Sequence, residues 1–163
     1  SLPFLQQIER EGSGPFLNMI PSLFISGRVL GLSPDLAFAL HLGFAAIVFA
    51  LLVWRLAVIK SPQRRAVLVL FATPLISPYL HSYDLALVAA GALLLGRDVV
   101  RAMRVPDLLV GILVVLGWAL ANILLGINEA GVPVAPLIGV ALFASAAALP
   151  EGGLPQKPPP AGP

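Results

Sequence analysis

A short polar stretch in an otherwise apolar chain brings together the side chains best suited to chemistry. Residues 72–84 read ATPLISPYLHSYD and include Tyr79, His81, Tyr83 and Asp84. His81 could contact a phosphate or relay a proton, because histidine titrates near physiological pH. Asp84 could orient His81, or bind a sugar hydroxyl or a metal ion. The two tyrosines could hydrogen-bond a hydroxyl and stack on a pyranose ring.

The same stretch also has a purely structural interpretation. Pro74 and Pro78 would end one helix, Ser82 would cap the next, and Asp84 would lie in its first turn. The two tyrosines would then be aromatic anchors at a membrane–water interface. Residue types alone leave both interpretations open, since ionisable groups at membrane depth are costly and often functional.

Two further candidate side chains, Arg28 and His41, lie outside this stretch. Arg28 follows a short amphipathic segment, residues 22–27, and its guanidinium could bind a phosphate bidentately or extend to lipid headgroups. His41 stands alone in an apolar run, which indicates a packing role or a hydrogen bond to another helix, with a functional role as the alternative. The two histidines of the chain are 40 residues apart, so the sequence predicts no metal site and no cofactor.

Composition indicates an integral membrane protein. Of the 163 residues, 58% are hydrophobic and 11% are charged, whereas a soluble domain carries about 25% charged residues. The chain has no cysteine, which excludes disulfides and cysteine nucleophiles. Its ten Lys and Arg residues flank apolar runs and form no single basic face, so we expect the lipid bilayer as a partner and no nucleic acid.

Apolar runs separated by basic or turn residues predict an all-α fold, a polytopic transmembrane bundle of about five spans. The expected helices are 34–59, 62–79, 84–101, 107–127 and 134–149, within a transmembrane domain of residues 34–149. The second and third would form a hairpin broken by prolines, with the polar stretch at its tip. Residues 1–33 are predicted to form a non-cytoplasmic interfacial segment, and residues 150–163 a disordered cytoplasmic tail.

Basic residues set the expected orientation of this bundle. The loops 55–65 and 97–104 carry seven of the ten Lys and Arg residues, and the positive-inside rule assigns both loops to the cytoplasm. The hairpin tip and Arg28 would then face the non-cytoplasmic side. We therefore expect a multi-pass protein of the inner (plasma) membrane.

Two segments resemble membrane-embedded glycosyltransferases of the GT-C type. ATPLISPYLHSYDLALVAAGALLL, residues 72–95, is similar to glycosyltransferase family 87, whose members often read Ala-Thr-Pro-Tyr-Leu and then, a few residues later, Tyr-Asp-Leu. Here the pattern is expanded by Leu-Ile-Ser at residues 75–77. PSLFISGRVLGLSPDLAFALHLGFAAIVFALLVWR, residues 21–55, resembles the family's serine, short apolar helix, arginine and Leu-Gly pair ahead of a long span. The resemblance covers about residues 16–100.

The resemblance implies the C-terminal portion of an enzyme like the polyprenol-phosphate-mannose-dependent α-mannosyltransferases. Such enzymes move a hexose, commonly mannose, from a polyprenyl-phosphate sugar to a glycan or glycolipid acceptor on the non-cytoplasmic face. Their catalytic base usually lies in the first outer loop, so we expect it upstream of this chain and expect this portion alone to be inactive. Arg28 and His81 become candidates for contact with the lipid phosphate. Tyr79, Tyr83 and Asp84 become candidates for holding the sugar.

Two other functions fit the same residues. Broken membrane helices also occur in transporters and flippases, where they line a substrate cavity. A non-catalytic membrane subunit would need the hairpin tip only for stability.

Overall fold

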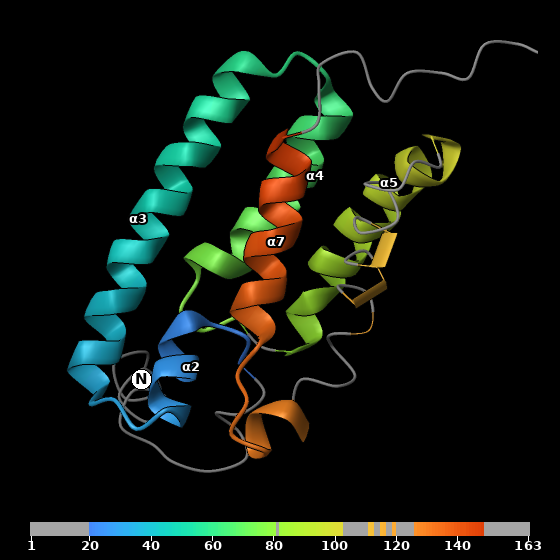
Figure 1. Ribbon diagram of the computed structural model, residues 1–163. Helices are drawn as coiled ribbons and strands as arrows, with labels where there is room; N and C mark the ends of the chain where they lie inside the picture. Colours follow the sequence, from blue (N-terminus) through green and yellow to red (C-terminus); the bar gives the residue numbers. More distant parts are fainter. Residues whose placement is uncertain are drawn as a thin grey trace, which may run out of the picture.

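The computed structural model describes residues 20–80, 82–102 and 126–148, together with residues 111, 112, 115, 116 and 119. Every regular element in these residues is helical, which confirms the predicted all-α class. The elements are α2 (Leu23–Val29), α3 (Pro34–Val58), α4 (Pro62–Ile76), the 3-10 helix η2 (Ser82–Leu85), α5 (Ala86–Ala102) and α7 (Ala135–Ala148) (Figure 1). The predicted tail and most of the predicted interfacial segment and of the span over 107–127 lie outside the described residues.

Two Ser-Pro pairs fix the starts of the two helices that follow them. The Oγ atoms of Ser33 and Ser61 each accept a hydrogen bond at 3.4 Å from the third amide further along the chain. Pro34 and Pro62 then occupy the first helical position, where the missing amide hydrogen costs nothing and the fixed φ suits a helix. α3 and α4 therefore begin at the residues expected from the sequence.

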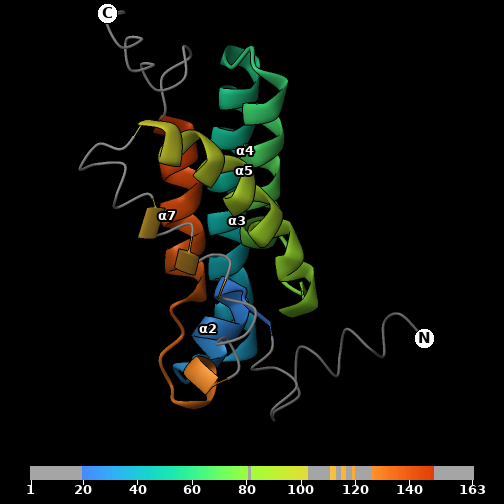
Figure 2. The same cartoon turned by 90° about the vertical axis from the view of Figure 1, so that its right-hand side faces the viewer.

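Helix α4 lies at the centre of the bundle. It contacts α3, α5 and α7 (Figures 1 and 2), and Leu68, Phe71 and Ala72 on it are at most 1% exposed. Close packing depends on a glycine of α5, because a Cβ atom at Gly91 would lie 2.8 Å from Phe71 Cε1 and 3.3 Å from Leu70 Cβ. A side chain at this position would therefore push α5 away from α4.

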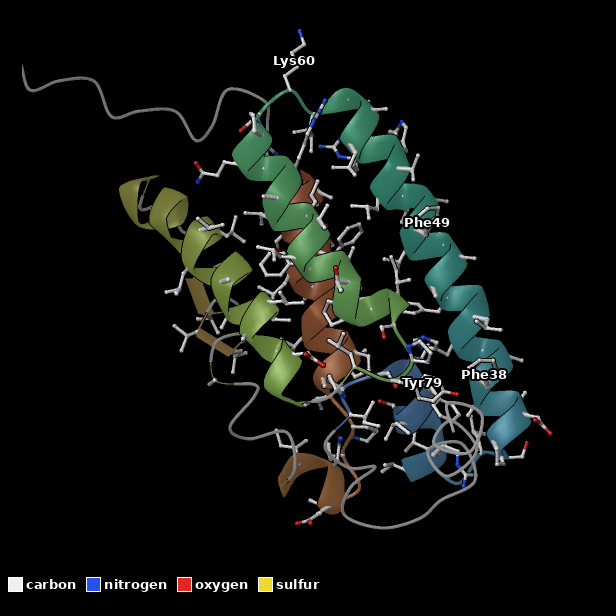
Figure 3. All side chains as sticks on the ribbon, turned by 180° about the vertical axis from the view of Figure 1, so that it is seen from behind. Phe38, Phe49, Lys60 and Tyr79 are labelled. Carbon is white, nitrogen blue, oxygen red and sulfur yellow. The ribbon has the colours of Figure 1, made fainter. Side chains whose placement is uncertain are left out.

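The end of α4 differs from the expected one. The helix stops at Ile76, three residues short of the expected end at residue 79, because Ser77 precedes Pro78 and adopts an extended conformation with ψ 125°. Pro74 lies inside the helix and does not end it. The last turn of α4 bends away from the axis of the rest (Figure 3), as expected where a proline removes a backbone hydrogen bond.

Helix α3 is much longer than α4, α5 and α7. With 25 residues α3 is about 37 Å long, and it is the one helix within the described residues that is long and apolar enough to cross a membrane. α4, α5 and α7 have 15, 17 and 14 residues, or about 21–26 Å at 1.5 Å per residue. A bundle of about five spans therefore stays a prediction.

The exterior of α3 is apolar. Only 28% of its most apolar 18-residue window is buried, and Ile47, Phe49 and Trp54 are 63%, 56% and 59% exposed. A core helix of a soluble protein would bury most of these side chains, whereas a helix in contact with lipid would expose them.

Charges divide between the two ends of the bundle. The basic end, where α3 ends and α4 begins, carries Arg55, Lys60, Arg64 and Arg65. The α2 end comprises α2, the start of α3, residues 77–80 and 82–85, and residues 126–134; the charged residues in these ranges are Arg28, Asp35, Asp84 and Glu129. The polar tip of the predicted hairpin thus lies at the end opposite the basic residues.

The contact between α4 and α5 can be tested by comparing two glycines. We expect Gly91→Val to lower the free energy of unfolding by about 1–3 kcal/mol, because the new side chain overpacks the contact with Phe71. Gly43→Val is the matched control, since nothing lies within 4 Å of a Cβ atom at Gly43. Thermal or denaturant unfolding of the detergent-solubilised protein measures both, and equal stability of the two variants would contradict the observed packing.

Candidate functional site

Arg28 is held in place by the way α2 begins and ends. Ser22 caps the start, accepting from Ile25 N at 3.2 Å. At the other end Gly31 has φ 87°, and Leu32 N donates to Gly27 O at 2.9 Å while Gly31 N donates to Arg28 O at 3.0 Å. These two bonds form a Schellman motif, which needs the left-handed conformation that glycine adopts easily. Arg28 therefore lies in the last turn of a helix closed at both ends.

The guanidinium of Arg28 is only partly satisfied. Its Nη1 donates to Leu32 O at 3.1 Å, so the side chain folds back on the loop after its own helix. Its Nε is buried and has no hydrogen-bond partner among the described residues. A buried donor without a partner costs about 1–3 kcal/mol, and an anion such as a phosphate would satisfy it.

Tyr79 anchors the hairpin tip on α2 and α3 through ring contacts. Its ring stacks on Phe38 of α3, with centroids 6.4 Å apart and planes at 27°, and meets Phe24 of α2 edge-on at 5.9 Å. Phe24 and Phe38 also meet edge-on, at 5.7 Å, so three elements contribute to one aromatic cluster near the start of α3 (Figure 3). Because Phe38 covers one face of the Tyr79 ring, this arrangement favours an anchoring role over stacking on a sugar.

His41 joins α3 to the broken end of α4. Its ring is fully buried, and its Nε2 lies 3.0 Å from Ile76 O. A carbonyl oxygen can only accept, so Nε2 carries the proton and donates. Ile76 ends α4, and its carbonyl has no amide donor from a further helical turn. The predicted hydrogen bond between helices is confirmed, and its partner is a backbone group at the hairpin tip.

The remaining candidates lie on or beside η2. Asp84 is half-buried in the first turn of this element, where the helix dipole favours a negative charge. His81 lies outside the described residues. Tyr83 belongs to η2, but its side chain also lies outside them.

Arg28, Tyr79 and Asp84 thus lie at the same end of the bundle, although they come from segments that are far apart in the sequence. Within the residues that the structure describes, no three His, Cys, Asp or Glu side chains are close enough to hold a metal ion. Sequence reasoning missed Phe24 and Phe38 as partners of Tyr79, because nothing local to either phenylalanine indicates contact with the tip. The amphipathic pattern of residues 22–27 is the signal that could have placed Phe24 in a small apolar core.

Comparison of the chain with protein-family models, with curated proteins and with solved structures found no match. The resemblance to glycosyltransferase family 87 therefore stays a prediction.

The bond from His41 can be tested with two variants. We expect His41→Leu to lower the free energy of unfolding by about 1–3 kcal/mol, because it removes the donor to Ile76 O. His41→Gln keeps an N–H donor and should retain part of the stability. Unfolding in detergent and hydrogen exchange at the amides of residues 79 and 80 measure the effect. Wild-type stability and wild-type exchange rates in His41→Leu would contradict a stabilising bond from His41 to Ile76 O.

The anchoring role of Tyr79 has its own matched pair of variants. Tyr79→Ala loses both ring contacts, each worth about 0.5–1.5 kcal/mol, so we expect the free energy of unfolding to fall by about 1–3 kcal/mol. Tyr79→Phe keeps the ring and should stay much closer to wild type. If the two variants are equally stable, the ring does not anchor the tip.

Proposed function

We propose that this chain is the C-terminal portion of an integral membrane glycosyltransferase that uses a polyprenyl-phosphate hexose, commonly mannose, as donor. The acceptor would be a glycan or glycolipid on the non-cytoplasmic face. The observation that carries the proposal is the buried Nε of Arg28, which has no partner among the described residues and lies at the same end of the bundle as the polar hairpin tip, opposite the basic residues.

The membrane placement draws on the exterior of the bundle and on its charges. Apolar side chains cover the outside of α3, and Leu93 and Leu137 on α5 and α7 are 64% and 69% exposed. If the whole bundle is membrane-embedded, the positive-inside rule puts the basic end in the cytoplasm. The α2 end then faces the opposite side, which is where a lipid-linked sugar donor would be used.

Such a placement also explains why α4 is short. Irregular backbone at membrane depth is tolerated where it is buried in protein or lines a cavity. Residues 77–80 are half-buried, Tyr79 packs on Phe24 and Phe38, and Ile76 O is bonded to His41. The tip would therefore form a fixed wall of a site open to the non-cytoplasmic side.

The chemistry of transfer assigns a part to Arg28. When the glycosidic bond to the lipid phosphate breaks, negative charge develops on the leaving phosphate, and a guanidinium stabilises it. Asp84 and the hairpin tip would hold the sugar, and His81 would add a second contact to the phosphate. We assign no catalytic base within this chain, because the resemblance puts that base upstream.

The proposal is tested with Arg28→Gln, introduced into the complete protein that contains this chain. We expect transfer of labelled mannose from polyprenyl-phosphate mannose to fall about 10- to 100-fold, as expected for the loss of a charge-assisted hydrogen bond in the transition state. Membrane insertion should be unchanged.

Arg65→Gln is the matched control, because Arg65 also donates to a backbone carbonyl, Ile59 O at 2.6 Å, but lies at the basic end. Its transfer rate should stay near that of the wild type. Equal rates in the two variants would remove Arg28 from the site. Activity that appears only as sugar movement across sealed vesicles, with no product in detergent, would favour a transporter or flippase instead.

A further inference from the structure

A groove runs between α3 and α7 on the half of the bundle nearest the basic end. It has a volume of about 560 Å³, within the range of about 300–1,000 Å³ typical of ligand pockets. Its lining includes Phe44, Ile47 and Leu51 from α3, Leu75 from α4, and Val140 and Ala144 from α7. Three alanines of α7 line the groove towards the basic end, and Gly139 allows close contact of α7 with Leu75 of α4.

A single cation lines this otherwise apolar groove. Arg55 lies in the last turn of α3 and lines the groove beside Trp54, with its guanidinium carbon 5.5 Å from the indole centroid. Its Nε is buried and has no hydrogen-bond partner within the described part of the chain. The groove therefore combines an apolar channel with a cation at its end.

The neighbouring arginines are already used by the fold. Arg64 Nη2 donates to Ala146 O at 3.4 Å and so ties α4 to the end of α7. Arg65 Nε donates to Ile59 O at 2.6 Å. Arg55 differs from both because its guanidinium lies over an aromatic ring, and its Nε has no hydrogen-bond partner among the described residues.

We propose that this groove binds an anionic glycerophospholipid, with one acyl chain along α3 and α7 and the phosphate on the Arg55 guanidinium. The apolar lining suits a hydrocarbon chain, and the cation suits a phosphate. Exposed apolar side chains of α3 border the groove, so a lipid enters it from the side. The inference rests on the membrane placement proposed above and is independent of transferase activity, since the groove lies towards the end opposite Arg28.

Binding is measured with Trp54 as the reporter, in a Trp118→Phe background of the full chain in neutral detergent. Phosphatidylglycerol with brominated acyl chains quenches the Trp54 fluorescence, and unlabelled phosphatidylglycerol or phosphatidylcholine with identical chains competes. The wild-type protein should bind phosphatidylglycerol in clear preference to phosphatidylcholine. Arg55→Gln should reduce that preference about tenfold, as expected when a charge-assisted bond is lost.

Two controls separate the groove from general effects. Lys60→Gln removes a cation at the same end that does not line the groove, and the preference should survive. Ala144→Leu fills the groove and should weaken quenching, whereas Ala50→Leu, at an exposed position of α3 outside the groove, should not.

Three results would overturn the inference. One is equal competition by the two phospholipids against the wild type. Another is that Arg55→Gln still prefers phosphatidylglycerol over phosphatidylcholine as strongly as the wild type and that Trp54 fluorescence in Ala144→Leu is still quenched as strongly. The third is stronger, Arg55-dependent competition by a polyprenyl phosphate, which would assign the groove to a prenyl lipid. The first two results leave the role proposed for Arg28 untouched, because no sugar transfer is measured, whereas the third would place a second binding site for the lipid part of the proposed donor at Arg55.

Discussion

The hydrogen bond from His41 to the Ile76 carbonyl is the contact on which the polar end of the molecule depends. Proline at position 78 stops α4 two residues earlier, and the last carbonyl is left without an amide donor. In apolar surroundings such a group needs a partner from the protein. The donor comes from α3, 35 residues earlier in the chain, at 3.0 Å. Residues 77–80 follow this bonded carbonyl, and Tyr79 among them packs on the rings of Phe24 and Phe38.

Four arginines of the bundle fall into two groups. At the basic end, Arg64 donates to Ala146 O and so joins α4 to α7. Arg65 donates to Ile59 O and so joins α4 to the loop that precedes α4. Arg28 and Arg55 lie at opposite ends, and each has a buried Nε with no partner among the described residues. Burying a polar donor without a partner is unfavourable, so an anion is the simplest group to complete both positions. The two anion sites proposed above would each complete one of these donors.

Local signals were read correctly from the sequence, and non-local ones were not. The Ser-Pro pairs fix the starts of α3 and α4 because capping involves only the next three residues. The expected end of α4 at residue 79 was wrong, because the helix stops at Ile76 before Pro78; Pro74 lies within it, where Phe71 and Leu75 pack in the core. The type of bond made by His41 could be expected from its isolation in an apolar run. Its partner could not, because the end of α4 is set elsewhere. The groove beside Arg55 was equally hidden, since it needs α7 to pack against α4.

The two segments that carry the family resemblance, residues 21–55 and 72–95, are the ones that meet at the α2 end. Their contact is the aromatic cluster of Phe24, Phe38 and Tyr79. A purely structural hairpin would need the same cluster, so this convergence alone does not separate an enzyme from a membrane subunit. The Arg28 guanidinium bonds Leu32 O in the loop after α2, while its Nε is buried without a partner among the described residues. The proposed phosphate contact would satisfy this second donor. The cost of leaving that donor unsatisfied is the physical reason to look for a ligand at this end of the bundle.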